Sequence, residues 1–436
     1  MERTAMAALT AWKTSARRKP LILQGARQVG KTWLLREFGR RHYSSIAYAN
    51  FEENEALASL FDGDLDPQRI LIALRAVLDS PISPGDTLLI LDEIQACPRA
   101  LTALKYFQEQ ANEHHVVCAG SLLGVAIHEG TSFPVGKVSF LDINPLSFRE
   151  YLTARGHQEM ANLLETADWD VINAVHQRFL TVLNEYMVVG GMPEVVTTFI
   201  AEESFAAARE VQNEILRSFD RDFSKHVPTE QLPKVRSVWS SIPAPLAKEQ
   251  KRFRYANLGP GARARSHETA VDWLVQAGLA LRVDQVTAPR LPLPSYQDAA
   301  AFKLFGFDVG LLGAMSQLSP AVATQGDRLY TEFKGSLAEQ FVASELHDRL
   351  GRPLHYWANQ QGRAKVDFLI QREQHIVPIE VKSGQSNQAK SLRVFRDKYA
   401  PEMSVRASLQ PYKRESWVIN LPLYAIGEVT TLPPRR

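Results

Sequence analysis

A glycine-bounded loop near the start of the chain constrains the possible fold more than any other feature. Residues 25–32 match the pattern G-x-x-x-x-G-K-[ST], between the apolar run Leu21–Leu23 and the amphipathic stretch Thr32–Arg41. A loop of this kind between a strand and a helix turns its backbone N–H groups inward around phosphate oxygens, and the helix N-terminus adds positive charge. The pattern predicts a phosphate-binding loop formed by Gly25, Ala26, Arg27, Gln28, Val29, Gly30, Lys31 and Thr32.

The first 145 residues repeat the same alternation of strand and helix. Short apolar runs, which are typical of buried strands, alternate with stretches whose apolar residues recur at helical spacing. The predicted strands are Leu21–Leu23, Ser45–Ala49, Thr87–Leu91, Val116–Ala119 and Val138–Leu141. The predicted helices are Thr32–Arg41, Pro67–Leu78 and Pro98–Asn112. This order of elements predicts a parallel α/β sheet.

Two adjacent carboxylates, Asp92 and Glu93, follow the predicted strand Thr87–Leu91. They emerge at the carboxyl end of a strand, which is where parallel sheets bind their ligands. Together with the phosphate loop, Asp92 is expected to hold Mg²⁺, and Glu93 to orient and deprotonate the attacking water. Lys31 is expected to reach the β- and γ-phosphates, and the Thr32 hydroxyl to bind the magnesium ion.

Ser121 ends the next predicted strand, and the residues alone leave two roles open for it. It contacts the γ-phosphate or the attacking water, or it caps a helix in a Gly-Ser turn. The guanine-reading pattern N-K-x-D does not follow, so we expect the bound nucleotide to be ATP rather than GTP.

Length and composition restrict the class of protein further. With 436 residues, the chain exceeds one ordinary core, so two or three domains are expected. Its net charge of +2 is nearly balanced and by itself says nothing about a nucleic-acid partner. Its two cysteines, Cys97 and Cys118, favour a reducing compartment. The sequence has no apolar region typical of a signal peptide and no run of about 18 apolar residues that could span a membrane. We therefore expect a cytoplasmic protein without a membrane partner.

A basic segment in the middle of the chain precedes a predicted helix, Ser266–Gln276, with Ser266 as its N-cap. The aromatic residues Phe253 and Tyr255 are interleaved with six basic residues. These basic residues are Lys248, Lys251, Arg252, Arg254, Arg263 and Arg265. A winged helix would present such a helix to the major groove of DNA, with the basic residues on phosphates. A solvated surface or a purely structural lid explains the pattern as well.

Four polar residues in the last hundred form a nuclease-like set: Glu339, Asp367, Glu380 and Lys382. Glu339 lies in an amphipathic helix, and the other three lie on two strands of a predicted hairpin. A turn centred on residues 373–374 places Asp367 opposite Glu380, with Cβ atoms roughly 5 Å apart. Carboxylates at that distance suit Mg²⁺ or Mn²⁺, and Lys382 on the same face as Glu380 would stabilise charge on a phosphate. The set predicts metal-assisted phosphodiester cleavage, although a binding module without cleavage stays open.

These motifs together resemble the AAA+ ATPases of the AAA_14 type that are followed by a DUF4143 region. The residues that carry the resemblance are Gly25–Thr32, Leu91–Gln95, Ala119–Leu123, Asn144–Tyr151, Val189–Pro193, Phe302–Phe305 and Asp308–Leu312. The resemblance covers most of the chain and implies an ASCE-type sheet followed by a winged helix. The last unit is similar to the PD-(D/E)xK nucleases, with metal ligands at Glu339, Asp367 and Glu380. It departs from related chains in having Lys365 where an acid is common, two residues before Asp367.

The resulting prediction is an α/β protein with four parts. They are an ATPase core at 1–145, a helical lid segment at 146–226, a winged-helix-like domain at 227–330 and a restriction-endonuclease-like domain at 331–436. The predicted function is ATP hydrolysis coupled to DNA contact and to metal-dependent cleavage, with ATP and Mg²⁺ as cofactors and a homo-oligomer or protein partner left open. One alternative is a non-catalytic ATP-dependent switch or scaffold whose last domain only binds. Another is a solitary ATPase that remodels protein partners.

Overall fold

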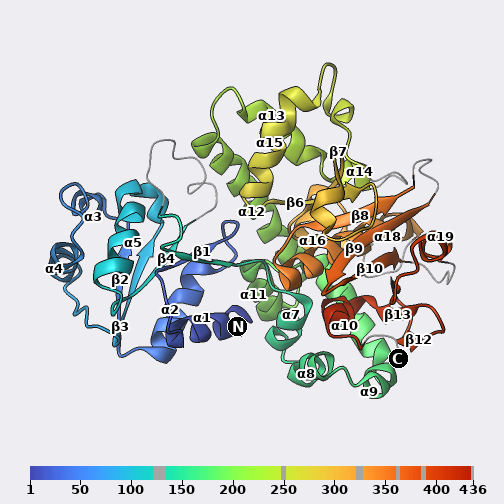
Figure 1. The fold of residues 1–436 in the computed structure, drawn as a ribbon, viewed down its shortest axis with the longest axis horizontal. Coiled ribbons are helices and arrows are strands. Elements are labelled where there is room, and N and C mark those ends of the chain that lie inside the picture. Colours follow the sequence, from blue (N-terminus) through green and yellow to red (C-terminus); the bar gives the residue numbers. More distant parts are fainter. Residues whose placement is uncertain (121–133, 247–251, 321–327, 360–363, 384–388, 434–436) are drawn as a thin grey trace. The chain divides into compact units, whose positions relative to one another are not determined.

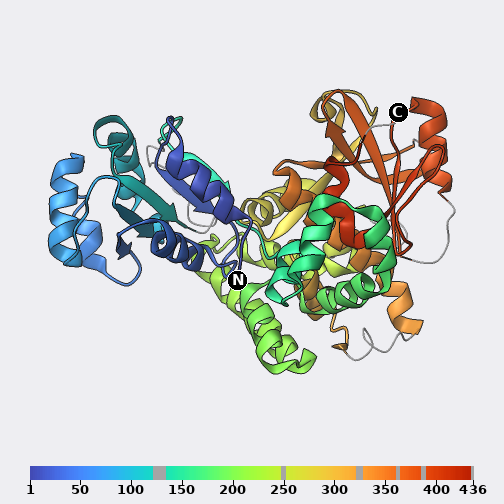
Figure 2. The same ribbon diagram turned by 90° about the horizontal axis from the view of Figure 1, so that it is seen from below.

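The computed structural model describes residues 1–120, 134–246, 252–320, 328–359, 364–383 and 389–433. Contacts divide the chain into two compact units. Unit 1 comprises Met1–Asn144 and Gln276–Gly278, and unit 2 comprises Pro145–Val275 and Leu279–Arg436. Figures 1 and 2 show the elements of each unit from two directions. The predicted lid segment 146–226 therefore belongs by its contacts to unit 2, together with the C-terminal strands.

Unit 1 is built on a parallel sheet, which confirms the predicted α/β class. Its described residues form five strands in the order β2-β3-β4-β1-β5. The strands are β1 (Leu21–Gln24), β2 (Ser45–Asn50), β3 (Thr87–Asp92), β4 (His115–Ala119) and β5 (Ser139–Asp142). The helices are α1 (Ala5–Thr14), α2 (Lys31–His42), α3 (Glu55–Ser59), α4 (Pro67–Leu78) and α5 (Pro98–Gln110), with the short η1 (Ile94–Ala96) after β3.

The central strands of this sheet are apolar because helices cover them. Every residue of β3 is buried, as expected for a strand with both faces covered. Parallel pairing sets the ends in register: Asn50 lies beside Asp92, and Leu23 beside Ala119. The carboxyl ends of β1, β3 and β4 therefore meet at one edge of the sheet.

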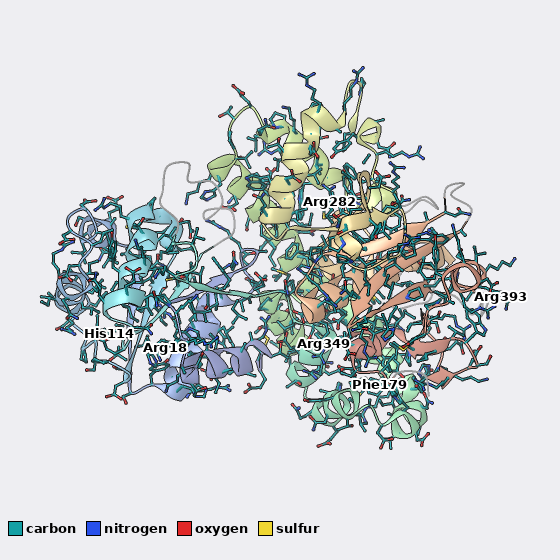
Figure 3. The ribbon with its side chains drawn as sticks, in the orientation of Figure 1. Arg18, His114, Phe179, Arg282, Arg349 and Arg393 are labelled. Carbon is teal, nitrogen blue, oxygen red and sulfur yellow. The ribbon has the colours of Figure 1, made fainter. Side chains whose placement is uncertain are left out.

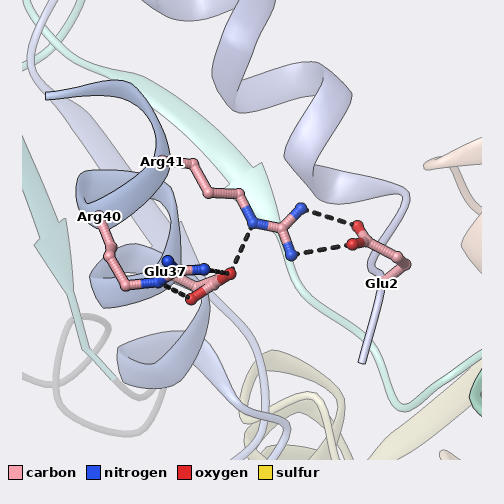
Figure 4. Close-up of polar contacts among 4 residues, drawn as sticks. All are labelled: Glu2, Glu37, Arg40 and Arg41. Carbon is pink, nitrogen blue, oxygen red and sulfur yellow. Dashed lines mark hydrogen bonds and ion pairs between the residues drawn. The ribbon is translucent and has the colours of Figure 1, made fainter.

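Arginine–carboxylate contacts tie the N-terminal segment to α2 (Figure 4). Arg41 donates to both carboxylate oxygens of Glu2, at 3.1 and 2.8 Å, and its Nε donates to Glu37 Oε1 at 2.6 Å. Arg40 donates to both oxygens of the same Glu37, at 2.8 and 2.7 Å. Hydrogen bonds from Arg40 and Arg41 lower the pKa of Glu37 to about 2. Because these groups lie at the surface, the contacts orient the segment more than they stabilise it.

Unit 2 begins with a helical region. Its helices up to the first strand are α7 (Phe148–Ala154), α8 (Gln158–Thr166), α9 (Trp169–Ala174), α10 (His176–Val189), α11 (Pro193–Glu202), α12 (Phe205–His226), α13 (Leu232–Ser241), α14 (Pro243–Leu246), η2 (Tyr255–Leu258) and α15 (Ala264–Gln276). The predicted N-cap of α15 is wrong by three residues. The helix begins at Ala264, so Ser266 lies inside its first turn, where its hydroxyl donates to the Arg263 carbonyl oxygen.

A mixed sheet follows, in which the described residues form eight strands in the order β12-β13-β11-β10-β9-β8-β6-β7. The strands are β6 (Ala280–Val286), β7 (Gln297–Gly306), β8 (Leu354–Ala358), β9 (Lys365–Arg372), β10 (His375–Lys382), β11 (Val405–Ser408), β12 (Lys413–Arg414) and β13 (Ile419–Pro422). The remaining elements are η3 (Leu293–Tyr296), α16 (Val309–Met315), α18 (Arg328–Leu350), α19 (Lys390–Tyr399) and η4 (Leu423–Thr430).

The β6–β7 hairpin departs from the predicted division at residue 330. The prediction places it in a winged-helix domain, but β6 pairs in parallel with β8, so one sheet runs across the predicted boundary. Residues 301–306 of β7 are all buried, as is typical of a strand covered on both faces. On this hairpin, Phe253 stacks on Phe302 with ring centroids 5.2 Å apart, and Arg282 lies 4.3 Å from the same ring (Figure 3).

The β9–β10 hairpin has the predicted register. His375 pairs with Arg372, and the pairing continues to Ile379 opposite Phe368. Pro378, which cannot donate to a ladder, lies opposite Leu369 within this pairing. One further step along both strands brings Asp367 and Glu380 level with each other.

Candidate functional site: the phosphate loop and the C-terminal carboxylate cluster

The phosphate loop joins the carboxyl end of β1 to the N-terminus of α2 (Figure 1). Gly25, Gln28 and Gly30 have positive φ angles of 142°, 66° and 89°. A Cβ atom at Gly25 would lie 2.1 Å from the carbonyl oxygen of Ile143, closer than any side chain tolerates. The path of the loop therefore depends on glycine at both of its ends.

Lys31 is 9% exposed and folds back over the loop. Its Nζ donates to the carbonyl oxygens of Gly25 and Ala26, at 3.1 and 2.8 Å. Burial lowers the pKa of Lys31 to about 8, although the carboxylates of Glu93 and Asp92 act in the opposite direction. A desolvated ammonium gains strongly from an anion, and a phosphate group in the loop would supply one.

Asp92 is the last residue of β3, is 3% exposed and accepts hydrogen bonds from two hydroxyl groups. Thr32 Oγ1 and the Tyr48 hydroxyl each donate to Asp92 Oδ2 at 2.8 Å. The guanidinium of Arg36 lies 3.9 Å from the centroid of the Tyr48 ring. The sheet thus brings the two residues predicted to bind magnesium, Thr32 and Asp92, into direct contact. A hydroxyl and a carboxylate at this spacing fit Mg²⁺, which takes few protein ligands and keeps several waters.

Glu93 has a left-handed backbone, with φ of 49°, which turns its side chain away from the direction of β3. Its N–H donates to Asp92 Oδ1 at 3.0 Å, and the side-chain amide of Gln95 donates to Glu93 Oε2. The first contact fixes the Glu93 backbone against Asp92, and the second holds the Glu93 carboxylate. A positioned carboxylate is what the activation of a water molecule requires.

The C-terminal set is buried in unit 2. Glu339 on α18, Asp367 on β9 and Glu380 on β10 are 6%, 4% and 4% exposed. Lys382 Nζ lies 2.8 Å from Glu380 Oε1. Burial raises the pKa of Glu380 above its usual range although Lys382 opposes the shift, and nearby Asp367 adds to the rise.

A fifth residue, Lys303 on β7, lies between two of these acids. Its Nζ is 3.3 Å from Glu339 Oε2, 3.4 Å from Asp367 Oδ1 and 3.5 Å from the Asp367 carbonyl oxygen. The other carboxylate oxygen of Asp367 accepts the Val381 N–H at 3.0 Å. Both side-chain oxygens of Asp367 therefore already have donors.

The arrangement does not fit the divalent metal that the sequence predicts at Glu339, Asp367 and Glu380. Mg²⁺ needs several oxygens at about 2.0–2.1 Å, whereas an ammonium group lies between two of the three acids. Within the described part of the chain, no group of three or more His, Cys, Asp or Glu side chains is arranged to hold a metal ion.

The arginines of the middle segment lie at the surface: Arg252, Arg254, Arg263 and Arg265 are all exposed. The interleaved aromatic side chains do not join them, since Phe253 is 4% exposed and packs on the β6–β7 hairpin. The solvent face of α15 is not uniformly basic either, because Glu268 and Asp272 are exposed on it. Three predicted residues, Ser121, Lys248 and Lys251, lie outside the described residues.

Three polar residues next to the predicted sites were missed from the sequence: Tyr48, Gln95 and Lys303. Lys303 carried a signal, because a lysine inside the apolar run 302–305 needs a buried counter-charge. Gln95 follows the Asp-Glu pair by two residues, and Tyr48 lies on the strand that pairs with β3. Gln95 ends the motif Leu91–Gln95, in which only Asp92 and Glu93 were given roles, and Tyr48 has no pattern in sequence that links it to the phosphate loop.

The parallel sheet, the loop after β1 and the carboxylates after β3 define the P-loop ATPase fold. Family comparison agrees: residues 17–152 match the AAA_14 model, described as an AAA domain. Residues 180–322 and 334–424 match two domains of unknown function, DUF8612 and DUF4143. The chain thus has an AAA_14 domain at its N-terminal end and a DUF4143 domain at its C-terminal end. No curated protein matches it.

Several solved structures match part of the chain. A Walker-type ATPase of Pyrococcus abyssi is 13% identical with a TM-score of 0.45, covering 72% of this chain and 95% of that one. The Orc1 protein of Aeropyrum pernix, in complex with DNA, is 13% identical with a TM-score of 0.28, covering 72% and 90%. Cdc6p of Pyrobaculum aerophilum is 11% identical with a TM-score of 0.25, covering 72% and 91%. These values are too low for a shared function to follow from them.

Among the described residues, no helix combines the length and the apolar character that crossing a bilayer requires.

Proposed function

We propose that this protein binds and hydrolyses ATP at the loop between β1 and α2. The observation that carries the proposal is the direct contact of Thr32 with Asp92 beside the buried Lys31. Thr32 and Asp92 would hold Mg²⁺, which neutralises phosphate charge when it is bound. Lys31 binds the β- and γ-phosphates, and the backbone of residues 25–30 surrounds them.

Glu93 has the second role in the proposal. Its backbone is fixed against Asp92 and its carboxylate is held by Gln95. This carboxylate orients the attacking water and accepts a proton from it. The roles separate binding from hydrolysis: Lys31 serves both, whereas Glu93 serves the hydrolytic step.

Measuring ATP affinity and phosphate release for two variants tests these roles. Lys31→Ala is expected to lose nucleotide binding and turnover together. Glu93→Gln is expected to keep affinity within a few-fold and to lose roughly a hundredfold or more in turnover. Lys105→Ala, an exposed lysine on α5 of the same unit, is the matched control and should leave both quantities unchanged. Wild-type turnover in Glu93→Gln would remove Glu93 from the hydrolytic step.

We further propose that the exposed arginines 252–265 contact DNA phosphates, so that ATP turnover in unit 1 serves a DNA-bound protein. Four exposed guanidinium groups within one short segment support this, since phosphate contacts dominate non-specific affinity. Because Glu268 and Asp272 on α15 would repel phosphates, the proposal assigns contact to the arginines and not to base reading by this helix. Cleavage is not included, because the C-terminal cluster does not fit the metal it would need.

The dependence of DNA affinity on salt tests this contact. Arg263→Glu combined with Arg265→Glu is expected to weaken binding and to reduce the slope of log affinity against log salt by about 2, near 0.9 per lost phosphate contact. The charge-matched control is Lys413→Glu with Arg414→Glu on β12, at the opposite edge of the sheet from β7. Equal effects of both pairs would mean that net charge, not this segment, determines binding.

A further inference from the structure

We propose that Lys303 is the resident cation of the C-terminal carboxylate cluster, which consists of Glu339, Asp367 and Glu380, so that the cluster binds no divalent metal. This goes beyond ATP hydrolysis and DNA contact, and it concerns a site of nuclease-like composition. The first support is position. Lys303 Nζ lies 3.3 and 3.4 Å from carboxylate oxygens that belong to α18 and β9, respectively.

Burial and the neighbouring aromatic rings hold this ammonium group in place. Lys303 is 2% exposed, and its ammonium lies 5.1 and 5.6 Å from the ring centroids of Tyr356 and Phe368. Aromatic rings beside the head group leave little room for it to leave the cluster, and they attract a cation. The carboxylates of Glu339 and Asp367, 3.3 and 3.4 Å from Nζ, stabilise the charged form of this side chain.

The acids and Lys303 depend on each other. Glu339 and Asp367 are both buried, and two buried carboxylates without a cation would repel each other and lose their hydration. A metal ion or an ammonium can meet this need, but not both in the same space, because their positive charges repel at contact distance. Since Lys303 already contacts both acids, the structure assigns the role of the cation to this lysine.

The other lysine of the cluster differs in a way that supplies a control. Lys382 is 31% exposed and contacts Glu380. Removing the Lys382 charge leaves Glu380 without its ion pair, while Glu339 and Asp367 keep their contacts with Lys303. Only the removal of Lys303 empties the space between Glu339 and Asp367.

Manganese binding to the full chain tests the proposal, in an Asp92→Asn background that removes the metal residue of the phosphate loop. In this background the otherwise unchanged chain is expected to show no saturable Mn²⁺ site by calorimetry or electron paramagnetic resonance. Lys303→Met should gain one saturable site and a melting temperature that rises with Mn²⁺. Lys382→Met should gain neither, and Glu339→Gln added to Lys303→Met should remove the gained site.

Three outcomes would overturn the proposal. The first is a saturable site in the Asp92→Asn chain that Asp367→Asn abolishes, and the second is Mn²⁺-dependent DNA cleavage that Asp367→Ala abolishes. The third is a folded Lys303→Met chain that binds no Mn²⁺. If Lys303→Met does not fold, Lys303→Gln takes its place, and the measurement with Lys303 present decides by itself. None of these results depends on ATP turnover or DNA affinity, so failure here is distinct from failure of the proposed function.

Discussion

At the residue scale, close backbone approach explains the Gly-Gly pair after α10. Gly190 has a φ angle of 76°, and a Cβ atom there would lie 2.4 Å from Asp308 Oδ1. Gly191 donates its N–H to Asp308 Oδ2 at 2.7 Å, and a Cβ atom on it would lie 2.2 Å from the Leu146 carbonyl oxygen. Asp308 also accepts the Leu311 N–H at 2.8 Å at the start of α16. The buried carboxylate of Asp308 thus joins the segment after α10 to the start of α16.

Gly191→Ala is expected to destabilise unit 2 by roughly 2–4 kcal/mol, because a methyl group cannot be placed against a carbonyl oxygen without moving the backbone. Urea unfolding followed by circular dichroism measures this. Gly313→Ala on α16 is the matched control, since its nearest neighbour is the flexible end of Arg209 at 3.5 Å. It should be neutral or slightly stabilising, and equal losses in both variants would contradict the steric explanation.

At the element scale, Glu345 joins α18 to the start of α7. Its Oε1 accepts the Phe148 N–H at 2.8 Å. Burial raises the pKa of Glu345 to about 8, the Phe148 N–H opposes the rise, and Asp348, Glu150 and Glu428 add to it. Because the pKa in the folded chain exceeds the unfolded value of 4.5, the folded state holds the proton more tightly. Stability from this group is full below the unfolded pKa and is lost as pH rises through the folded one.

Glu345→Gln keeps the acceptor for Phe148 and removes the titration. Unfolding measured from pH 5 to pH 8 should show the wild type losing stability relative to the variant, by on the order of 1–3 kcal/mol across the window. Glu194→Gln, at an exposed position on α11, should follow the wild type at every pH. Parallel curves for the wild type and Glu345→Gln would mean that Glu345 does not titrate in this range.

At the scale of the whole molecule, the two units bury separate apolar clusters. One gathers side chains from the strands and helices of unit 1, such as Ile22, Leu89 and Phe107. Another gathers side chains from β8, β9 and α19 of unit 2, such as Trp357, Val366 and Phe395. Separate cores predict separate unfolding transitions.

Calorimetry should therefore resolve two transitions, and only that of unit 1 should respond to nucleotide. MgATP at a hundred times its dissociation constant adds about 2.7 kcal/mol, which is a rise of roughly 5–10 °C for a unit of this size. Lys31→Ala should abolish the rise and leave the other transition unchanged. A single transition that shifts as a whole would show that the units unfold as one.

Local patterns in the sequence were enough to predict the parallel sheet of unit 1, the phosphate loop and the β9–β10 register. Each rests on residues near one another in the chain, where apolar spacing and glycine positions determine local backbone geometry. Contacts between distant segments decided the rest. Lys303 lies 36 residues from Glu339 and 64 from Asp367, and the β6–β7 hairpin joins β8 across the predicted boundary. A buried charge requires a partner, but its spacing in sequence does not identify that partner. Only strand order and helix packing bring the ammonium to its two carboxylates.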